Sequence, residues 1–136
     1  MSNNQLSVRL TAIALGGALL SALMLTPALA ADPVGVWKRP STGTVVEFYG
    51  CGSRLCAKIV GVADASRQST VGTVIMSGAD QKGDGVWKGD LLNTEDGKTY
   101  SGVVTMIDDG HLKLEGCALL GIVCKGEVWD RQPAQQ

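Results

Sequence analysis

Three Asp-Gly pairs, at Asp84-Gly85, Asp96-Gly97 and Asp109-Gly110, each stand between short apolar runs of the sequence. Asp-Gly tolerates the positive φ angles of tight hairpin turns, so each pair predicts a reversal between antiparallel strands. Of the 18 glycines, two precede residue 31, and the other sixteen are spread between the apolar runs instead of forming a linker. This spacing predicts an all-β chain built from consecutive hairpins.

The charged residues indicate which strand side chains face inward, because neighbouring side chains of a strand point to opposite faces. An outward Glu47 sends Val46 and Phe48 inward, and Trp87 should turn inward because it precedes Lys88. The same phasing places these residues inside: Leu55, Ala57, Ile59, Gly61, Tyr100, Gly102, Val104, Met106, Leu112 and Leu114.

Seven or eight short antiparallel strands can form a sandwich or a closed barrel. Closure leaves no unpaired edge, so we expect a small antiparallel up-and-down barrel that spans residues 31–136 as a single domain. The interior of an eight-stranded barrel is either filled by side chains or holds one small ligand. Any cavity should therefore be modest.

The first thirty residues have the features of a cleavable signal peptide. Arg9 is followed by a run from Leu10 to Ala31 without an ionisable side chain, and Ala28-Leu29-Ala30 offers the small residues that signal peptidase requires. An uncleaved membrane anchor is the alternative, but several polar residues and glycines dilute the run. We expect cleavage before Ala31, no stable membrane span afterwards, and a periplasmic or secreted protein.

Four cysteines, Cys51, Cys56, Cys117 and Cys124, fit an oxidising compartment and allow three disulfide connectivities. Sequential pairing is favoured, because each pair brackets a short turn. A four-thiolate zinc site and a catalytic redox pair are alternatives. Neither pair has the usual zinc spacing, and no Cys-x-x-Cys motif is present.

Charge and motifs exclude or weaken several functional classes. Without residues 1–30 the chain has eleven basic and thirteen acidic residues, which argues against a nucleic-acid partner. His111 should face water and has no nucleophile motif nearby. The segment Asp80 to Gly85 resembles the start of a calcium loop, but Lys82 occupies a ligand position. We therefore expect no catalytic site, no metal site and no cofactor.

Several motifs carry a resemblance to a known family over essentially the whole mature chain. The motifs occur in this order: Gly35-Val36-Trp37, Cys51-Gly52, Leu55-Cys56-Ala57-Lys58-Ile59-Val60, Trp87-Lys88-Gly89, Asp96-Gly97-Lys98-Thr99-Tyr100-Ser101-Gly102, Leu112-Lys113-Leu114-Glu115-Gly116-Cys117 and Val128-Trp129-Asp130-Arg131. With them the chain resembles the exported bacterial family catalogued as domain of unknown function 2147. The resemblance implies a small barrel similar to lipocalins and fatty-acid-binding proteins, and no established activity.

The motif Gly35-Val36-Trp37 is also similar to the opening of lipocalin barrels, in which an arginine of the last strand covers the tryptophan. The resemblance implies that Arg131 covers Trp37 and closes one end of the barrel through a cation–π contact. One orientation stays open. If Glu127 points outward, Trp129 and Arg131 share its face unless a bulge intervenes.

Two functional hypotheses remain. The first is an exported barrel that binds a small apolar molecule, with a candidate pocket formed by Phe48, Trp87, Tyr100, Val104 and Met106. The same aromatic residues could instead simply fill the core. The alternative is a non-enzymatic envelope module with a solid core, whose outward apolar residues, such as Val45 and Val103, recognise a protein or glycan. An enzyme is a third class with no specific support.

Overall fold

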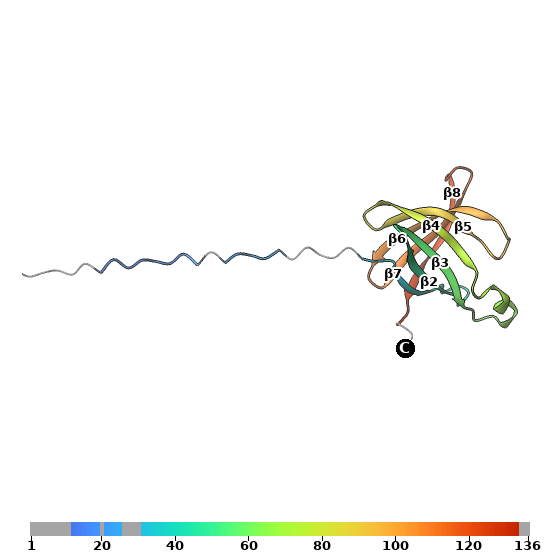
Figure 1. Ribbon diagram of the computed structural model, residues 1–136, viewed down its shortest axis with the longest axis horizontal. Helices are drawn as coiled ribbons and strands as arrows, with labels where there is room; N and C mark the ends of the chain where they lie inside the picture. Colours follow the sequence, from blue (N-terminus) through green and yellow to red (C-terminus); the bar gives the residue numbers. More distant parts are fainter. Residues whose placement is uncertain (1–11, 20, 26–30, 134–136) are drawn as a thin grey trace, which may run out of the picture.

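The computed structural model describes residues 12–19, 21–25 and 31–133, and the last of these ranges contains a closed eight-stranded barrel (Figure 1). The elements are β1 (Gly35–Lys38), β2 (Val45–Cys51), β3 (Arg54–Gly61), the 3-10 helix η1 (Ala65–Thr70), β4 (Val74–Gly83), β5 (Val86–Leu92), β6 (Thr99–Asp108), β7 (His111–Ala118) and β8 (Val123–Arg131). Each strand pairs antiparallel with the next, and β1 pairs with β8. The predicted all-β up-and-down barrel is confirmed.

The segment before the barrel adds no regular element in its described part. Residues 12–19 and 21–25 contain no helix or strand. The predicted cleavage motif, Ala28 to Ala30, lies outside the described residues, so the signal peptide and the domain boundary at residue 31 stay predictions. Within the part of the chain that is described, no helix combines the length and apolarity needed to cross a membrane.

The Asp-Gly turns lie where the sequence predicted them. Asp84-Gly85 joins β4 to β5, Asp109-Gly110 joins β6 to β7, and Asp96-Gly97 lies in the loop between β5 and β6. Gly85 and Gly97 both have a φ of 71°, a conformation that glycine adopts without the steric penalty of a side chain. The turn chemistry therefore sets the hairpin order of the barrel.

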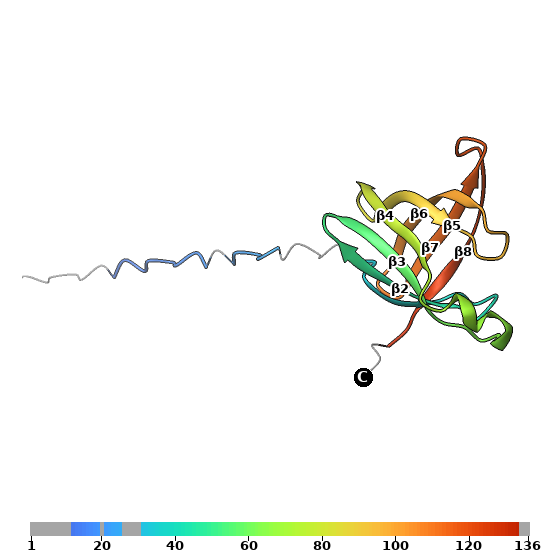
Figure 2. The same cartoon turned by 45° about the vertical axis from the view of Figure 1, so that its right-hand side comes forward.

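The up-and-down order divides the connections between two ends of the barrel (Figure 2). The β2–β3, β4–β5 and β6–β7 turns lie at one end, where the chain also enters β1 and leaves β8. We call this the closed end. The β1–β2, β5–β6 and β7–β8 connections and the segment with η1 lie at the other, which we call the open end.

A tryptophan and an arginine fill the closed end. Trp37 is fully buried, and its indole nitrogen donates a hydrogen bond to the carbonyl of Pro33 at 2.8 Å. The guanidinium of Arg131 lies over the Trp37 ring, 4.2 Å from its centroid. Arg131 also donates to the carbonyls of Asp32, Val34 and Asp109, at 2.6, 2.9 and 2.5 Å.

Gly35 makes room for this arginine. A Cβ at this position would lie 2.6 Å from Nη1 of Arg131, and Gly35 has a φ of 139°. The backbone angle therefore favours glycine, and a side chain at this position would displace the guanidinium from its place. The Gly-x-Trp motif and the last-strand arginine form one unit.

The buried apolar side chains form one core cluster inside the barrel. The largest fully buried side chains are Trp37, Val46, Phe48, Met76, Val104 and Leu112. Two inner glycines let strands approach closely. A Cβ at Gly89 would lie 2.7 Å from the Cα of Ala79, and one at Gly102 would lie 2.8 Å from the Cβ of Leu91. The predicted inward phasing of β2, β3, β6 and β7 agrees with this burial.

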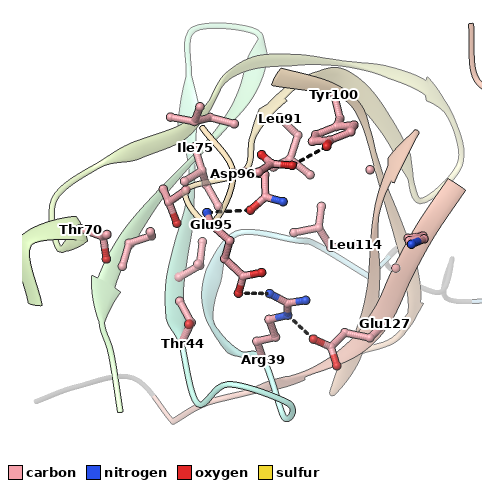
Figure 3. Close-up of a pocket in the computed structure, with 18 of the residues that line it drawn as sticks. Arg39, Thr44, Thr70, Ile75, Leu91, Glu95, Asp96, Tyr100, Leu114 and Glu127 are labelled. Carbon is pink, nitrogen blue, oxygen red and sulfur yellow. Dashed lines mark hydrogen bonds and ion pairs between the residues drawn. The ribbon is translucent and has the colours of Figure 1, made fainter. Parts of the chain in front are cut away.

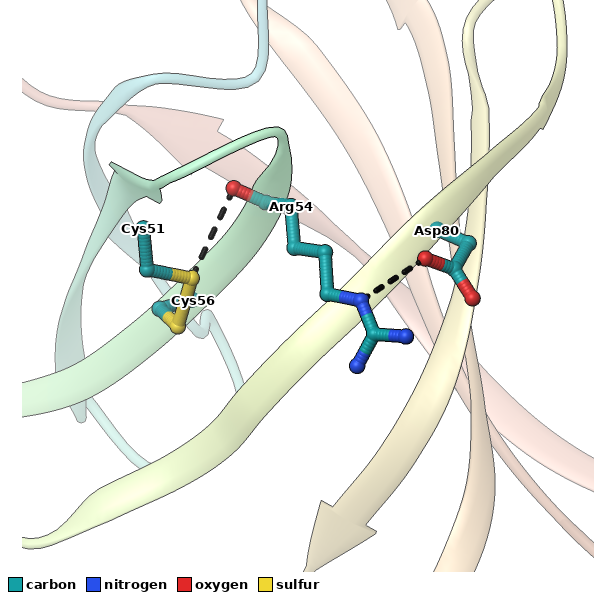
Figure 4. Close-up of a disulfide and its surroundings, with 4 residues drawn as sticks. All are labelled: Cys51, Arg54, Cys56 and Asp80. Carbon is teal, nitrogen blue, oxygen red and sulfur yellow. Dashed lines mark hydrogen bonds and ion pairs between the residues drawn. A yellow bond between two sulfur atoms is a disulfide. The ribbon is translucent and has the colours of Figure 1, made fainter.

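Both disulfides join sequential cysteines. Cys51 pairs with Cys56 across the β2–β3 turn, and Cys117 pairs with Cys124 across the β7–β8 turn. Figure 4 shows the first of them beside Arg54, which pairs with Asp80 of β4 at 3.0 Å. Closing such short loops contributes only about 2–2.5 kcal/mol each in the chain-entropy model. The disulfides brace individual hairpins, and the barrel is held by its core and its closed end.

Replacing Arg131 with alanine tests the role of the closed end. The variant loses the contact with Trp37 and three hydrogen bonds to backbone carbonyls, so we expect the free energy of unfolding to fall by about 2–4 kcal/mol. Urea denaturation measures this change. Arg54→Ala is the matched control at the same end, because it removes one exposed ion pair and should change stability by about 1 kcal/mol or less. Equal effects of the two variants would contradict the assigned role of Arg131.

Candidate ligand-binding cavity

A cavity of about 610 Å³ occupies the open end of the barrel (Figure 3). Its deeper walls are apolar and come from strands on all sides: Val46, Ile59, Ile75, Leu91, Leu114 and Trp129. Small-molecule sites typically have volumes of about 300–1,000 Å³ with mostly apolar walls and a few polar groups. The volume and lining therefore suit one small molecule.

Loop residues and Glu127 of β8 add a polar rim. Arg39, just after β1, donates from Nε to Oε1 of Glu127 on β8, and its Nη1 lies 3.5 Å from Oε1 of Glu95 in the β5–β6 loop. Ser41 donates to the same Glu127 oxygen at 2.6 Å. Figure 3 shows Arg39 between the two carboxylates. One guanidinium thus links three separate elements across the mouth of the cavity.

The charge of Glu127 is favoured by these neighbours. Its side chain is 28% exposed, and this partial burial by itself raises the pKa of the carboxyl. Hydrogen bonds from Ser41 and Arg39, together with the positive charge of Arg39, outweigh burial and hold the pKa of Glu127 below its ordinary value. Glu127 is therefore ionised at neutral pH.

A second polar pair lies on the rim. The Tyr100 hydroxyl donates to Oδ2 of Asp96 at 2.5 Å. This hydrogen bond lowers the pKa of Asp96 and raises the pKa of Tyr100, because it favours the charged carboxylate and the neutral phenol. The pair fixes the Tyr100 ring against the wall of the cavity.

The lining contains equal numbers of basic and acidic side chains: Arg39, Arg67, Lys125, Glu95, Asp96 and Glu127. All three carboxylates contact a partner within the rim. The formal charges of these six side chains therefore sum to zero, and Lys125 and Arg67 are the two cations among them without an ion pair in the described part of the chain.

The structure separates the five residues proposed from the sequence as a pocket. Tyr100 lines the cavity. Phe48 and Val104 are buried in the core, and Trp87 and Met106 pack against it. These four do not line the cavity, because their inward-facing positions lie below its floor. The lining residues that sequence reasoning missed lie in the loops of the open end and along β2, β3, β4, β5, β7 and β8.

The orientation of Glu127 is resolved by the register of β8. β7 and β8 pair without a register shift from His111 with Asp130 to Ala118 with Val123, so no bulge intervenes. Glu127 and Trp129 both line the cavity. The alternative of an outward Glu127 is wrong, because its charge points into the mouth and pairs with Arg39.

The other candidate chemistry lies away from the cavity. His111 lies at the closed end, exposed, with its Nδ1 2.8 Å from Asp108 and its Nε2 3.6 Å from Asp130. Asp80, the first residue of the segment that resembles a calcium loop, is on β4 and pairs with Arg54. Within the described residues there is no group of three or more potential metal ligands.

The Glu127 pairing predicts a specific pH dependence of stability. A carboxylate whose pKa is depressed on folding contributes stability above its unfolded value, ordinarily 4.5, and loses it as the pH falls through the folded value. Glu127→Gln should therefore be less stable than wild type at neutral pH. The difference should shrink in acid, as measured by urea denaturation across pH.

The control for this experiment is Glu47→Gln, which removes one carboxylate from an exposed pair with Lys58 on the outer face. Its effect at neutral pH should be smaller, because exposed pairs contribute about 0–1 kcal/mol. A pH-independent difference for Glu127→Gln would contradict a role for the charge of this residue.

Comparison with known proteins agrees with the fold. No curated protein matches the chain. The solved structure of protein HP1028 from the human pathogen Helicobacter pylori, described as belonging to the lipocalin family, is similar with a TM-score of 0.64 and 21% sequence identity, over 76% of this chain and 84% of that chain. At this identity the likeness concerns the fold alone. A family model described as an uncharacterized protein conserved in bacteria, DUF2147, matches residues 35–131. The chain therefore belongs to the DUF2147 family of bacterial proteins, and its barrel is lipocalin-like.

Proposed function

We propose that this protein binds a small, mostly apolar molecule in the open end of its barrel. The observation that carries the proposal is the cavity of about 610 Å³ with apolar deeper walls. Affinity would come from apolar surface removed from water against Ile75, Leu91 and Leu114, at roughly 25 cal/mol per Å². The polar rim would hold any polar group of the ligand at the mouth.

The cavity also favours binding over the alternative of a solid interaction module. The closed half of the barrel is filled by Trp37, Phe48 and their neighbours, whereas the open half is hollow. We propose that the protein binds its ligand and does not catalyse a reaction on it. The single histidine, His111, lies at the far end of the barrel, away from the apolar walls.

We further propose that the protein acts outside the cytoplasm, in the periplasm or as a secreted protein. Its two disulfides support this location, because disulfides persist in oxidising compartments. The uncharged run from Leu10 to Ala31 supports export through a cleaved signal peptide.

Filling part of the cavity from its wall should weaken binding. A Cβ at Gly116 of β7 would make only ordinary contacts, 3.5 Å from the Cβ of Tyr100 and 3.8 Å from Cδ2 of Leu91, so Gly116→Val should fold while its side chain occupies ligand space. We expect at least a ~tenfold weaker affinity for the neutral probe N-phenyl-1-naphthylamine, or about 1.4 kcal/mol. Fluorescence titration measures the affinity.

Gly50→Val is the matched control. Gly50 lies on β2, a Cβ added there would have no atom within 4 Å, and the residue is not part of the cavity lining. The substitution should therefore leave probe affinity unchanged. Saturable binding by wild type and Gly50→Val, with loss in Gly116→Val, supports the proposal. A wild-type protein that does not bind the probe, or equal affinities for all three proteins, would refute it.

A further inference from the structure

The tip of the β7–β8 hairpin carries the most exposed large apolar side chains in the range 31–133. Leu119, Leu120 and Ile122 are 71%, 103% and 81% exposed. Figures 1 and 2 both show this hairpin projecting beyond the barrel. We call Leu119–Ile122 the apolar tip. Aliphatic side chains grouped on a projection, rather than scattered singly, indicate a contact surface.

The backbone of the apolar tip is strained. Leu119 and Leu120 have φ angles of 52° and 58°, and they are the non-glycine residues with positive φ among those described. Glycine or asparagine would adopt this conformation at a lower conformational energy than leucine, because the Cβ of leucine is crowded there. Strained backbone of this kind tends to occur at functional sites. Leucines stand at two positions whose backbone conformation suits glycine. We therefore infer that their side chains have a function.

The hairpin is nevertheless braced. The Cys117–Cys124 disulfide joins the two strands directly below the turn. Within the turn, the Gly121 amide donates to the carbonyl of Ala118 at 3.2 Å, and the Ile122 amide donates to the carbonyl of Leu119 at 3.3 Å. The strained turn is thus closed by its own bonds and presents its side chains outward.

These features fit a lipid bilayer better than a protein partner. The apolar tip is a projection, which enters a soft phase without needing a matching pocket. Its internal hydrogen bonds pair two of the turn amides, and an unpaired amide would be costly to bury in hydrocarbon. No ionisable side chain lies between Glu115 and Lys125.

The charge next to the apolar tip identifies the kind of lipid. Glu115, the nearest charged residue on β7, is paired with Lys113 at 2.9 Å. Lys125, the nearest on β8, forms no ion pair among the described residues. The uncompensated charge beside the apolar residues is therefore positive, which complements anionic head groups.

We propose that the apolar tip inserts into the surface of a bilayer that contains anionic lipids, with Lys125 at the level of the head groups. Ala118 and Val123, at the base of the same hairpin, line the cavity. Insertion would therefore bring the mouth of the cavity close to the membrane. The proposal concerns the outer surface of the hairpin and holds whether or not the cavity takes a ligand.

Flotation with vesicles tests the proposal. Vesicles of phosphatidylcholine alone are compared with vesicles of equal parts phosphatidylcholine and phosphatidylglycerol. Wild type should bind the mixed vesicles more tightly. Leu120→Gly should bind them about tenfold more weakly, because it removes one inserted aliphatic side chain. Lys125→Gln should bind them about fivefold more weakly and leave any binding to phosphatidylcholine unchanged.

Leu120→Gly also separates binding from folding. Glycine relieves the positive φ of Leu120, so the urea midpoint should stay the same or rise while binding falls. Ile107→Gly is a control for apolar surface, because Ile107 is 53% exposed near the closed end of β6 and should not affect binding. Absence of wild-type binding to the mixed vesicles, with or without self-association of the protein, overturns the proposal. Equal binding by wild type and Leu120→Gly overturns it as well.

Discussion

The barrel depends on the seam where its short first strand meets its last. β1 has four residues and pairs with β8 at Trp37 with Arg131 and at Lys38 with Asp130. An arginine reinforces each end of this seam. Arg131 of β8 reaches over β1 at the closed end, and Arg39, which follows β1, reaches Glu127 of β8 at the open end. Side chains thus complete a closure that few backbone bonds provide, and closure removes the exposed edges of an open sheet.

The two arginines have different surroundings. Arg131 lies at the end of the barrel that is filled by side chains, and Arg39 lies at the end that contains the cavity. At the closed end the guanidinium packs on the buried Trp37 ring and bonds to backbone carbonyls. At the open end the guanidinium bonds to carboxylates at the mouth of the cavity, above apolar walls that include Trp129. A molecule in the cavity would rest on a fixed floor of strands and meet a rim of longer, charged side chains from loops.

Much of this architecture could be predicted from the sequence, because it depends on local signals. The Asp-Gly pairs mark turns, Glu47 and Lys58 set the inner faces of β2 and β3, and each cysteine pair brackets one turn. The position of a residue along the barrel axis could not be predicted. Alternation shows that Phe48 and Val104 face inward, but it does not show that they lie below the floor of the cavity.

Long-range pairs and loops account for the remaining differences. The orientation of Glu127 stayed open in the sequence, because a charge inside a barrel is costly unless it is paired. Its partner Arg39 is 88 positions away in the sequence, so no local pattern reveals the pair. The orientation of the loop residues of the rim, such as Glu95 and Asp96, could not be predicted either. Irregular segments have no periodicity that indicates which way a side chain points.

The most direct test of a barrel that is solid at one end and receptive at the other is an NMR titration of methyl-labelled protein with a neutral naphthalene probe. The account predicts chemical-shift changes and probe contacts at the methyl groups of Ile59, Ile75 and Leu114, which line the cavity. The methyl groups of Val104 and Leu112 in the core should change much less. Probe contacts confined to the outer surface, or no change at the cavity methyl groups at saturation, would contradict the account.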